Sequence, residues 1–269
     1  MKFKTNSLTY FIFALGWSTV FWTASALLSP GEDPSQSVLF LIGGAGPLIA
    51  ALVLTYTRED RRTRGDFWVR AYDSRRIRWP WSAATLLLHP AIILIAFGLG
   101  AAFGDPAPTL NPRAGSLTSL LTLAFFVFWF GPLPEELGWR GFALDRLQVR
   151  QTALVASLIL GSVWALWHVP LFFIPGTFQF ELGFGSARAW IFLLSNIPLS
   201  VLITWVFNNT DRSTLSAVLI HWTGNLTGAL LPKSDLVAGL ELVLLVVAAA
   251  VVVAGWGAQR LMRREAVNP

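Results

Sequence analysis

Six polar residues, in three short groups, stand in or beside apolar stretches of this sequence: Glu135, Glu136 and Arg140, then His168, then His221 and Asn225. Hydrolysis of a peptide bond needs a base for the attacking water, an acid for the leaving amine and donors for the oxyanion. Glutamate, histidine and asparagine can fill these roles. The three groups are therefore candidates for a hydrolytic site, provided that the fold brings them together.

The composition narrows both the class of protein and the available chemistry. Of the 269 residues, 54% are hydrophobic and 13% charged, whereas about a quarter of residues are charged in soluble domains. This composition predicts a membrane protein rather than a soluble enzyme. The chain has no Cys, which excludes disulfides, thiolate zinc sites, iron–sulfur clusters and cysteine nucleophiles. Any catalysis must use oxygen or imidazole groups.

The spacing of Glu135, Glu136 and Arg140, here called the acidic group, indicates which of these charges can pair. On a helix, Glu136 and Arg140 are i,i+4 neighbours, whereas Glu135 points about 100° away from Glu136. Glu136 can therefore be neutralised by Arg140 while Glu135 stays free. The alternative is a helix that leaves the membrane, so that these charges simply meet water. From the residues alone, the two glutamates are nearly equivalent as candidates for a base.

The histidines lie in apolar segments, where ionisable side chains are costly and usually face the protein interior or a water-filled cavity. Trp164 and His168 share one helical face, and so do His221 and Asn225. The alternative for both groups is a set of hydrogen bonds that only holds helices together. His89 has no polar companion in its local sequence, so we expect a structural role for it.

Eight apolar segments are candidates for helices that cross a membrane, which takes about 20 residues. They cover residues 8–28, 37–56, 81–103, 117–131, 153–173, 189–207, 215–231 and 236–256. No repeat or long polar stretch separates them. We therefore predict a single all-α domain over residues 1–269, a polytopic bundle of about eight transmembrane helices embedded in the lipid bilayer.

The basic residues predict the orientation of this bundle. If the N-terminus is cytoplasmic, all of the 20 Lys and Arg except Arg113, Arg188 and Lys233 lie on the cytoplasmic side. The positive-inside rule explains this asymmetry, and the net charge of +5, without a nucleic-acid partner. We expect a multi-pass protein of the cytoplasmic membrane with both termini in the cytoplasm. The arginines of residues 58–78 could also bind anionic lipid or a partner, and residues 24–26 resemble a signal-peptide cleavage site.

Taken together, the three groups resemble the signature of the CPBP family of CAAX prenyl endopeptidases and bacteriocin-processing enzymes, also called the Abi family, which are intramembrane proteases. The resemblance covers residues 117–231, expected to be the catalytic core, with the groups in the family's order and each on its own helix. One departure is Trp164, four residues before His168, where the family usually has Phe. An aromatic side chain is kept, so the resemblance holds.

The resemblance implies a role for each residue. Glu135 and His168 would activate a water molecule, while His221 and Asn225 would stabilise the oxyanion on the scissile carbonyl. Glu136, Arg140 and Trp164 would support the site structurally. The substrate would be a peptide or membrane protein. A non-catalytic immunity or scaffold protein of the same family is the alternative, and a small-solute transporter with Glu and His as a relay is a weaker one.

No cofactor is expected for this chemistry. The His-Glu-x-x-His motif of zinc proteases is absent, which removes the main sequence support for a metal mechanism. A zinc site built from Glu135, His168 and His221 remains the chemical alternative.

The predicted spans place Glu135 and His168 at opposite faces of the membrane, because both lie late in antiparallel segments. For the two residues to meet, the fourth helix must continue past residue 131. We expect a kinked helix through Pro132 and Pro134 that reaches about Leu147 and brings Glu135 to mid-depth.

Overall fold

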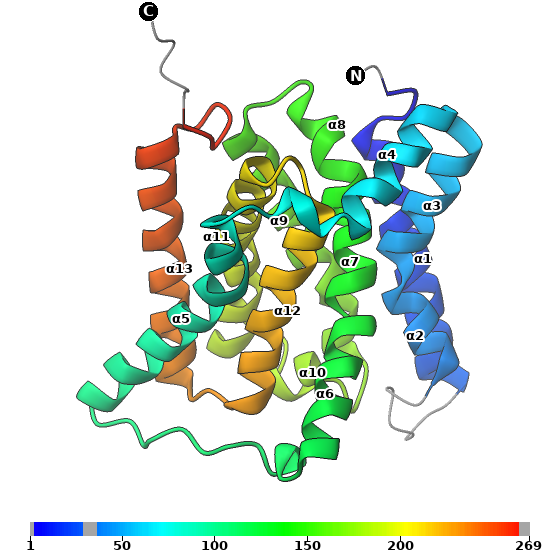
Figure 1. Cartoon of the computed structure of the whole chain (residues 1–269). Coiled ribbons are helices and arrows are strands. Elements are labelled where there is room, and N and C mark those ends of the chain that lie inside the picture. The colour runs from blue at the N-terminus through cyan, green and yellow to red at the C-terminus, as the bar shows by residue number, and fades with distance from the viewer. Residues whose placement is uncertain (1–2, 29–36, 264–269) are drawn as a thin grey trace, which may run out of the picture.

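The computed structural model describes residues 3–28 and 37–263. In chain order, the elements are α1 (Ser7–Leu28), α2 (Val38–Gly44), α3 (Gly46–Arg58), α4 (Arg61–Tyr72), η2 (Ser74–Arg76), α5 (Trp81–Ala102), η3 (Pro112–Ala114), α6 (Leu117–Trp129), α7 (Pro132–Gly138), η4 (Trp139–Leu144), α8 (Asp145–Gln148), α9 (Ala153–His168), η5 (Val169–Phe173), α10 (Phe178–Leu182), α11 (Ala187–Asn209), α12 (Thr214–Leu230) and α13 (Asp235–Trp256). These described ranges contain helices and no strand, which confirms the all-α prediction (Figure 1).

Within the described ranges, six helical stretches are long and apolar enough to cross a membrane: α1, α5, the run from α6 to α8, α9 with η5, α11 and α13. The pair α2 and α3 is bent by 60° and would make a seventh if it crosses as one span. The predicted segment at residues 215–231 corresponds to α12, which has 17 residues. This helix stands inside the bundle in front of α9 and α11 (Figure 1). The polytopic bundle is thus as expected, with α12 shorter than a full span.

The bend between α2 and α3 has a local cause. Pro47, in the first turn of α3, has no N–H to donate to the preceding turn. The carbonyl oxygen of Gly43 instead accepts a hydrogen bond from Ser18 Oγ of α1 at 2.7 Å, and that of Ile42 accepts one from Trp17 Nε1 at 3.1 Å. Polar side chains of α1 therefore satisfy backbone groups that lie at membrane depth.

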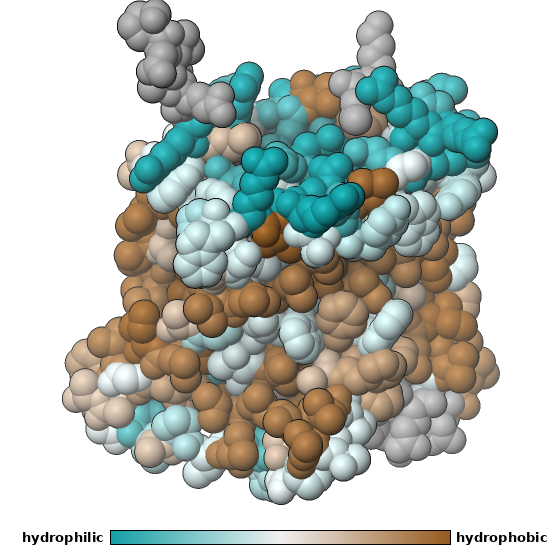
Figure 2. Space-filling model, in the orientation of Figure 1, coloured by the Kyte–Doolittle hydropathy of each residue, from teal (hydrophilic) through white to brown (hydrophobic). Residues whose placement is uncertain are grey.

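The outer surface is divided into an apolar belt and a polar end. Several exposed side chains on α1, α5 and α13 are large and apolar: Leu8, Ile12, Val20, Leu87, Leu94, Ile95, Val243, Val247 and Val251. Figure 2 shows this belt below a hydrophilic end, where α4 lies. Helix α1 begins and α13 ends at that same end (Figure 1). A belt of this kind is expected of helices that face lipid hydrocarbon.

The fourth span runs from Leu117 to Gln148, and two interruptions of its helix lie on either side of Glu135 and Glu136. Helix α6 ends before Gly131, and Pro132 opens α7 at a position where its missing N–H costs nothing. After Gly138 the chain forms η4, a π-helix, a feature often found at functional sites. The expected kinked continuation is therefore present, and it carries the acidic group inside the span.

Two arginines donate to backbone carbonyl oxygens of the π-helix. Arg70 Nη2 of α4 bonds to Gly141 O at 2.9 Å, and Arg146 Nη1 bonds to Phe142 O at 2.7 Å. Arg70 also pairs with Asp145 at 2.9 Å. The polar end of the bundle thus fixes the helix that carries the acidic group.

Gly138 stands where three segments meet, and its replacement by alanine is expected to destabilise the protein. A Cβ there would lie 2.3 Å from the hydroxyl of Tyr10 and 2.5 Å from the carbonyl oxygen of Pro47. We expect a loss of about 1–3 kcal/mol, as for overpacked cores. Thermal unfolding in detergent measures it. Gly16→Ala in α1, where a Cβ would meet nothing within 4 Å, is the control, and an equal melting temperature for both variants would contradict this expectation.

Candidate active site

The residues that the sequence singled out lie together in one group, here called the polar cluster: Glu135, Glu136, Arg140, Trp164, His168, His221 and Asn225. A buried ion pair is part of this cluster. Arg140 Nη1 lies 2.8 Å from Oε1 and 2.9 Å from Oε2 of Glu136, and both side chains are 0% exposed. Arg140 Nη2 donates to Ser200 Oγ of α11 at 3.0 Å. Because a buried charge is costly unless it is paired and hydrogen-bonded, this arrangement holds η4 against α11.

The Glu136 carboxylate also binds His221, on α12. The Nδ1 atom of His221 lies 2.9 Å from Glu136 Oε1, and its Nε2 atom lies 3.0 Å from Asn225 Nδ2. An ionised carboxylate only accepts, so Nδ1 carries the proton, and Nε2 of the neutral ring accepts from the Asn225 amide. A continuous hydrogen-bonded chain thus runs from Arg140 through Glu136 and His221 to Asn225. His221 is buried, whereas Asn225 is exposed.

Glu135 points to a different set of partners. Its Oε2 atom accepts a hydrogen bond of 2.6 Å from Trp164 Nε1. Its Oε1 atom makes no hydrogen bond in the described ranges. A Cβ at Gly131 would lie 3.9 Å from this Oε1 and 4.0 Å from Asn225 Nδ2, so both polar atoms border the same small space.

Trp164 links the acidic group to His168. His168 Nδ1 donates to the Trp164 carbonyl oxygen at 2.9 Å, and the two rings are 6.0 Å apart. The Trp164 ring also lies 4.9 Å from that of His221 and 5.2 Å from the Arg140 guanidinium carbon. Within the part of the chain that the structure describes, His168 Nε2 has no hydrogen-bond partner. Since Nδ1 donates its proton to a carbonyl, Nε2 is the acceptor nitrogen of the neutral ring.

The structure therefore brings the three sequence groups to one place. Trp164 makes contacts with residues of all of them, and it joins α9 to α7 and α12. The depth conflict between Glu135 and His168 disappears because α7 lies within the fourth span and not beyond it. His168 forms no direct hydrogen bond with Glu135 among the described residues.

The zinc alternative can be compared with the same geometry. Among the described residues, no three His, Asp or Glu side chains are arranged to hold a metal ion. Both ring nitrogens of His221 are hydrogen-bonded, and Glu135 Oε2 is taken by Trp164. In this arrangement, Glu135 Oε1 and His168 Nε2 are the acceptor atoms of this set that have no hydrogen-bond partner among the described residues.

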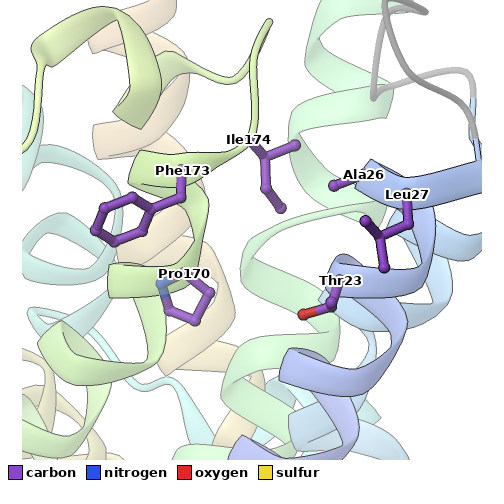
Figure 3. Close-up of a pocket in the computed structure, with 6 residues that line it drawn as sticks. All are labelled: Thr23, Ala26, Leu27, Pro170, Phe173 and Ile174. Atoms are coloured by element: carbon purple, nitrogen blue, oxygen red, sulfur yellow. The ribbon is translucent and has the colours of Figure 1, made fainter.

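A pocket of about 260 Å³ lies near the end of α9, apart from the polar cluster. Its lining comes from the last turns of α1 and from η5 with the residue after it: Thr23, Ala26, Leu27, Pro170, Phe173 and Ile174 (Figure 3). None of these side chains can take up or release a proton near neutral pH. This pocket therefore supplies no group for acid–base chemistry.

Comparison with known proteins agrees with this geometry. Residues 117–227 match the family described as Type II CAAX prenyl endopeptidase Rce1-like. Over 258 aligned residues the chain is 30% identical to CAAX prenyl protease 2 of Methanococcus maripaludis. The alignment covers 93% of this chain and 94% of that relative. The chain belongs to the Rce1-like CAAX prenyl endopeptidase family. Membership confirms the CPBP resemblance and, with the apolar helices, indicates a multi-pass membrane protease that acts on peptide or protein substrates.

Sequence reasoning missed some partners in this Rce1-like protein. Ser200 was not distinguishable from other small polar residues of an apolar span. The second partner of Glu136, His221, lies 85 residues away, so no local spacing indicates it. His89 has no polar companion in its local sequence, but it meets Glu241 at 3.4 Å across the bundle, a partner that local spacing could not indicate.

Proposed function

We propose that this chain is an endopeptidase in which Glu135 and His168 activate the attacking water. The observation that carries the proposal is that, among the described residues, Oε1 of Glu135 and Nε2 of His168 have no hydrogen-bond partner, while the opposite atom of each is held by Trp164. A water bound by these acceptors would give up a proton to Oε1 of Glu135 as its oxygen attacks the scissile carbonyl, and this proton would pass to the leaving amine as the C–N bond breaks. The indole and the helix backbone keep both side chains oriented.

Asn225 and His221 are proposed to stabilise the oxyanion. One N–H of the Asn225 amide points to His221 Nε2, so the second N–H remains available for a developing negative charge. His221 itself can donate from Nε2 only when the ring is protonated, and the nearby Glu136 carboxylate would stabilise that imidazolium. In that state Nε2–H donates to the oxyanion, and the Asn225 amide, which can no longer donate to Nε2, turns its N–H groups toward the same oxyanion.

Glu136, Arg140 and Trp164 are proposed to position these groups. The Glu136 carboxylate, neutralised by Arg140, fixes the tautomer of His221. Neither charged side chain is exposed, so we assign them no contact with substrate. No metal is needed in this scheme.

The proposed substrate is a protein or peptide with a prenylated C-terminal CAAX segment. The name of the relative, CAAX prenyl protease 2, supports this class, since 94% of that protein aligns with this chain. We further propose a cytoplasmic-membrane location with the polar end, which carries α4 and most of the basic residues, in the cytoplasm.

The test uses the purified full chain in lipid nanodiscs with a farnesylated peptide that ends in a CAAX sequence. We expect hydrolysis of one peptide bond, seen by mass spectrometry, with slower or absent cleavage of the unprenylated peptide. Absence of cleavage of either peptide, or of a mixed peptide library, would contradict the proposal. Activity lost with a chelator and restored by zinc would favour the metal alternative.

A further inference from the structure

A second polar group, two of whose three members are buried, lies outside the proposed catalytic cluster. Its members are His89 of α5, Glu241 of α13, and Lys233, which stands between α12 and α13. His89 Nε2 is 3.4 Å from Glu241 Oε1, and Lys233 Nζ is 2.5 Å from Glu241 Oε2. His89 is 5% and Glu241 6% exposed. Ionisable groups at such a depth are costly and usually serve a function, yet the proposed mechanism does not use them.

The His89 ring is packed directly on the backbone of α12. A Cβ at Gly224 would lie 1.7 Å from His89 Nδ1 and 2.4 Å from its Cγ and Cε1. The ring therefore occupies the volume that any other residue at position 224 would fill. One turn further along α12, a Cβ at Gly228 would lie 3.6 Å from Lys233 Nζ, which is an ordinary contact. Two members of the group thus follow one face of α12.

The contact is adjacent to the proposed oxyanion site. Gly224 immediately precedes Asn225 and lies three residues after His221. On another side, Trp222 Nε1 of α12 donates to the Ala124 carbonyl oxygen of α6 at 3.0 Å. A shift of α12 by about 1 Å would move both oxyanion groups, and errors of this size can cost about 100-fold in rate.

Glu241 holds the ring in this place. The Glu241 carboxylate accepts from Nε2, so the neutral ring carries its proton there, and the ammonium group of Lys233 neutralises the carboxylate. His89 Nδ1 has no hydrogen-bond partner among the described residues. Among the described residues, Glu241 therefore makes the one hydrogen bond that orients the ring over Gly224.

We propose that Lys233, Glu241 and His89 form a positioning unit that sets the depth and rotation of α12, and with them the placement of His221 and Asn225 relative to Glu136 and Glu135. This inference rests on the proposed function. These three residues make no contact with substrate; they act through the backbone of Gly224.

The first test compares Gly224→Ala with Gly228→Ala, measured as kcat and KM for the cleaved peptide. The new Cβ at 224 must displace the His89 ring or α12, so we expect kcat to fall about 100-fold with KM changed less than about threefold. Gly228→Ala, with only an ordinary contact, should keep wild-type kcat. Equal kcat for both variants would overturn the inference.

The second test is rescue in a double variant. His89→Ala removes the ring and leaves room for the Cβ of Gly224→Ala, so the double variant should recover kcat at least about tenfold over Gly224→Ala. A general loss of structure at α12 would not be relieved in this way. No recovery in a folded double variant would overturn the inference.

A third variant keeps the test valid if Gly224→Ala does not fold. Glu241→Leu is similar in size but cannot accept the hydrogen bond from His89 Nε2, and it should lower kcat without changing KM. Wild-type kcat in folded Glu241→Leu would count against the positioning unit. Glu135→Gln, measured in parallel, separates the two proposals. If Glu135→Gln cleaves the peptide, the proposed mechanism is refuted. If Glu135→Gln is inactive while Gly224→Ala is fully active, only the positioning role is refuted.

Discussion

Replacing Glu135 by glutamine is expected to lower kcat for peptide cleavage by about 10²- to 10⁴-fold, the contribution typical of a general base. The amide oxygen of glutamine can still accept the hydrogen bond from Trp164 Nε1, so the geometry is kept. What disappears is the ability of Oε1 to take a proton from water. KM should change little, because the proposed role is in the chemical step.

The measurement is a steady-state assay on the farnesylated peptide with the protein in nanodiscs. Glu181→Gln makes the same chemical change at an exposed position on α10 and should retain full activity. Wild-type kcat in Glu135→Gln would remove Glu135 from the catalytic assignment and make Glu136 or His221 the next candidate for the base.

Replacing Glu136 by alanine is expected to have the largest effect on stability, a loss of about 3–5 kcal/mol. The substitution leaves the fully buried guanidinium of Arg140 without its carboxylate and removes the acceptor of His221 Nδ1. An unpaired buried charge costs far more than the lost pair contributes in net terms. Detergent-solubilised protein should unfold at a clearly lower temperature and in less denaturant.

Two further variants identify the cause. Glu135→Ala removes a neighbouring buried carboxylate that forms no salt bridge with the described residues, so it should cost much less stability than Glu136→Ala. Adding Arg140→Met to Glu136→Ala removes the stranded charge and should restore part of the lost stability. If the double variant is as unstable as Glu136→Ala, the loss arises from packing and not from the uncompensated charge.

Much of the site could be predicted because polar residues are rare in this chain. A glutamate, a histidine or an asparagine in an apolar span must meet another polar group, so residue type and position alone are enough to indicate a site. The pairing of Glu136 with Arg140 could also be predicted from the sequence. Residues four apart on one helix are always neighbours, whatever the rest of the fold does.

The partners across helices could not be predicted. Nothing local indicates that His221 meets Glu136 rather than Glu135, that Trp164 binds the other carboxylate, or that His89 meets Glu241. Each contact joins residues on different helices, and their meeting depends on helix depth, rotation and tilt. Pro47 bends one span, and the breaks at Gly131 and Gly138 carry the acidic group deeper into another.

Residue type and helical periodicity were enough to predict which side chains are available for catalysis, that the fold is helical, and which side chains share a helix face. The tertiary structure decided which of two adjacent glutamates has a free carboxylate oxygen and which is held by Arg140 and His221. The physical reason is that two residues about 100° apart on one helix face different neighbours. Only the packing of α9 and α12 against α7, and of α11 against η4, determines which neighbours those are.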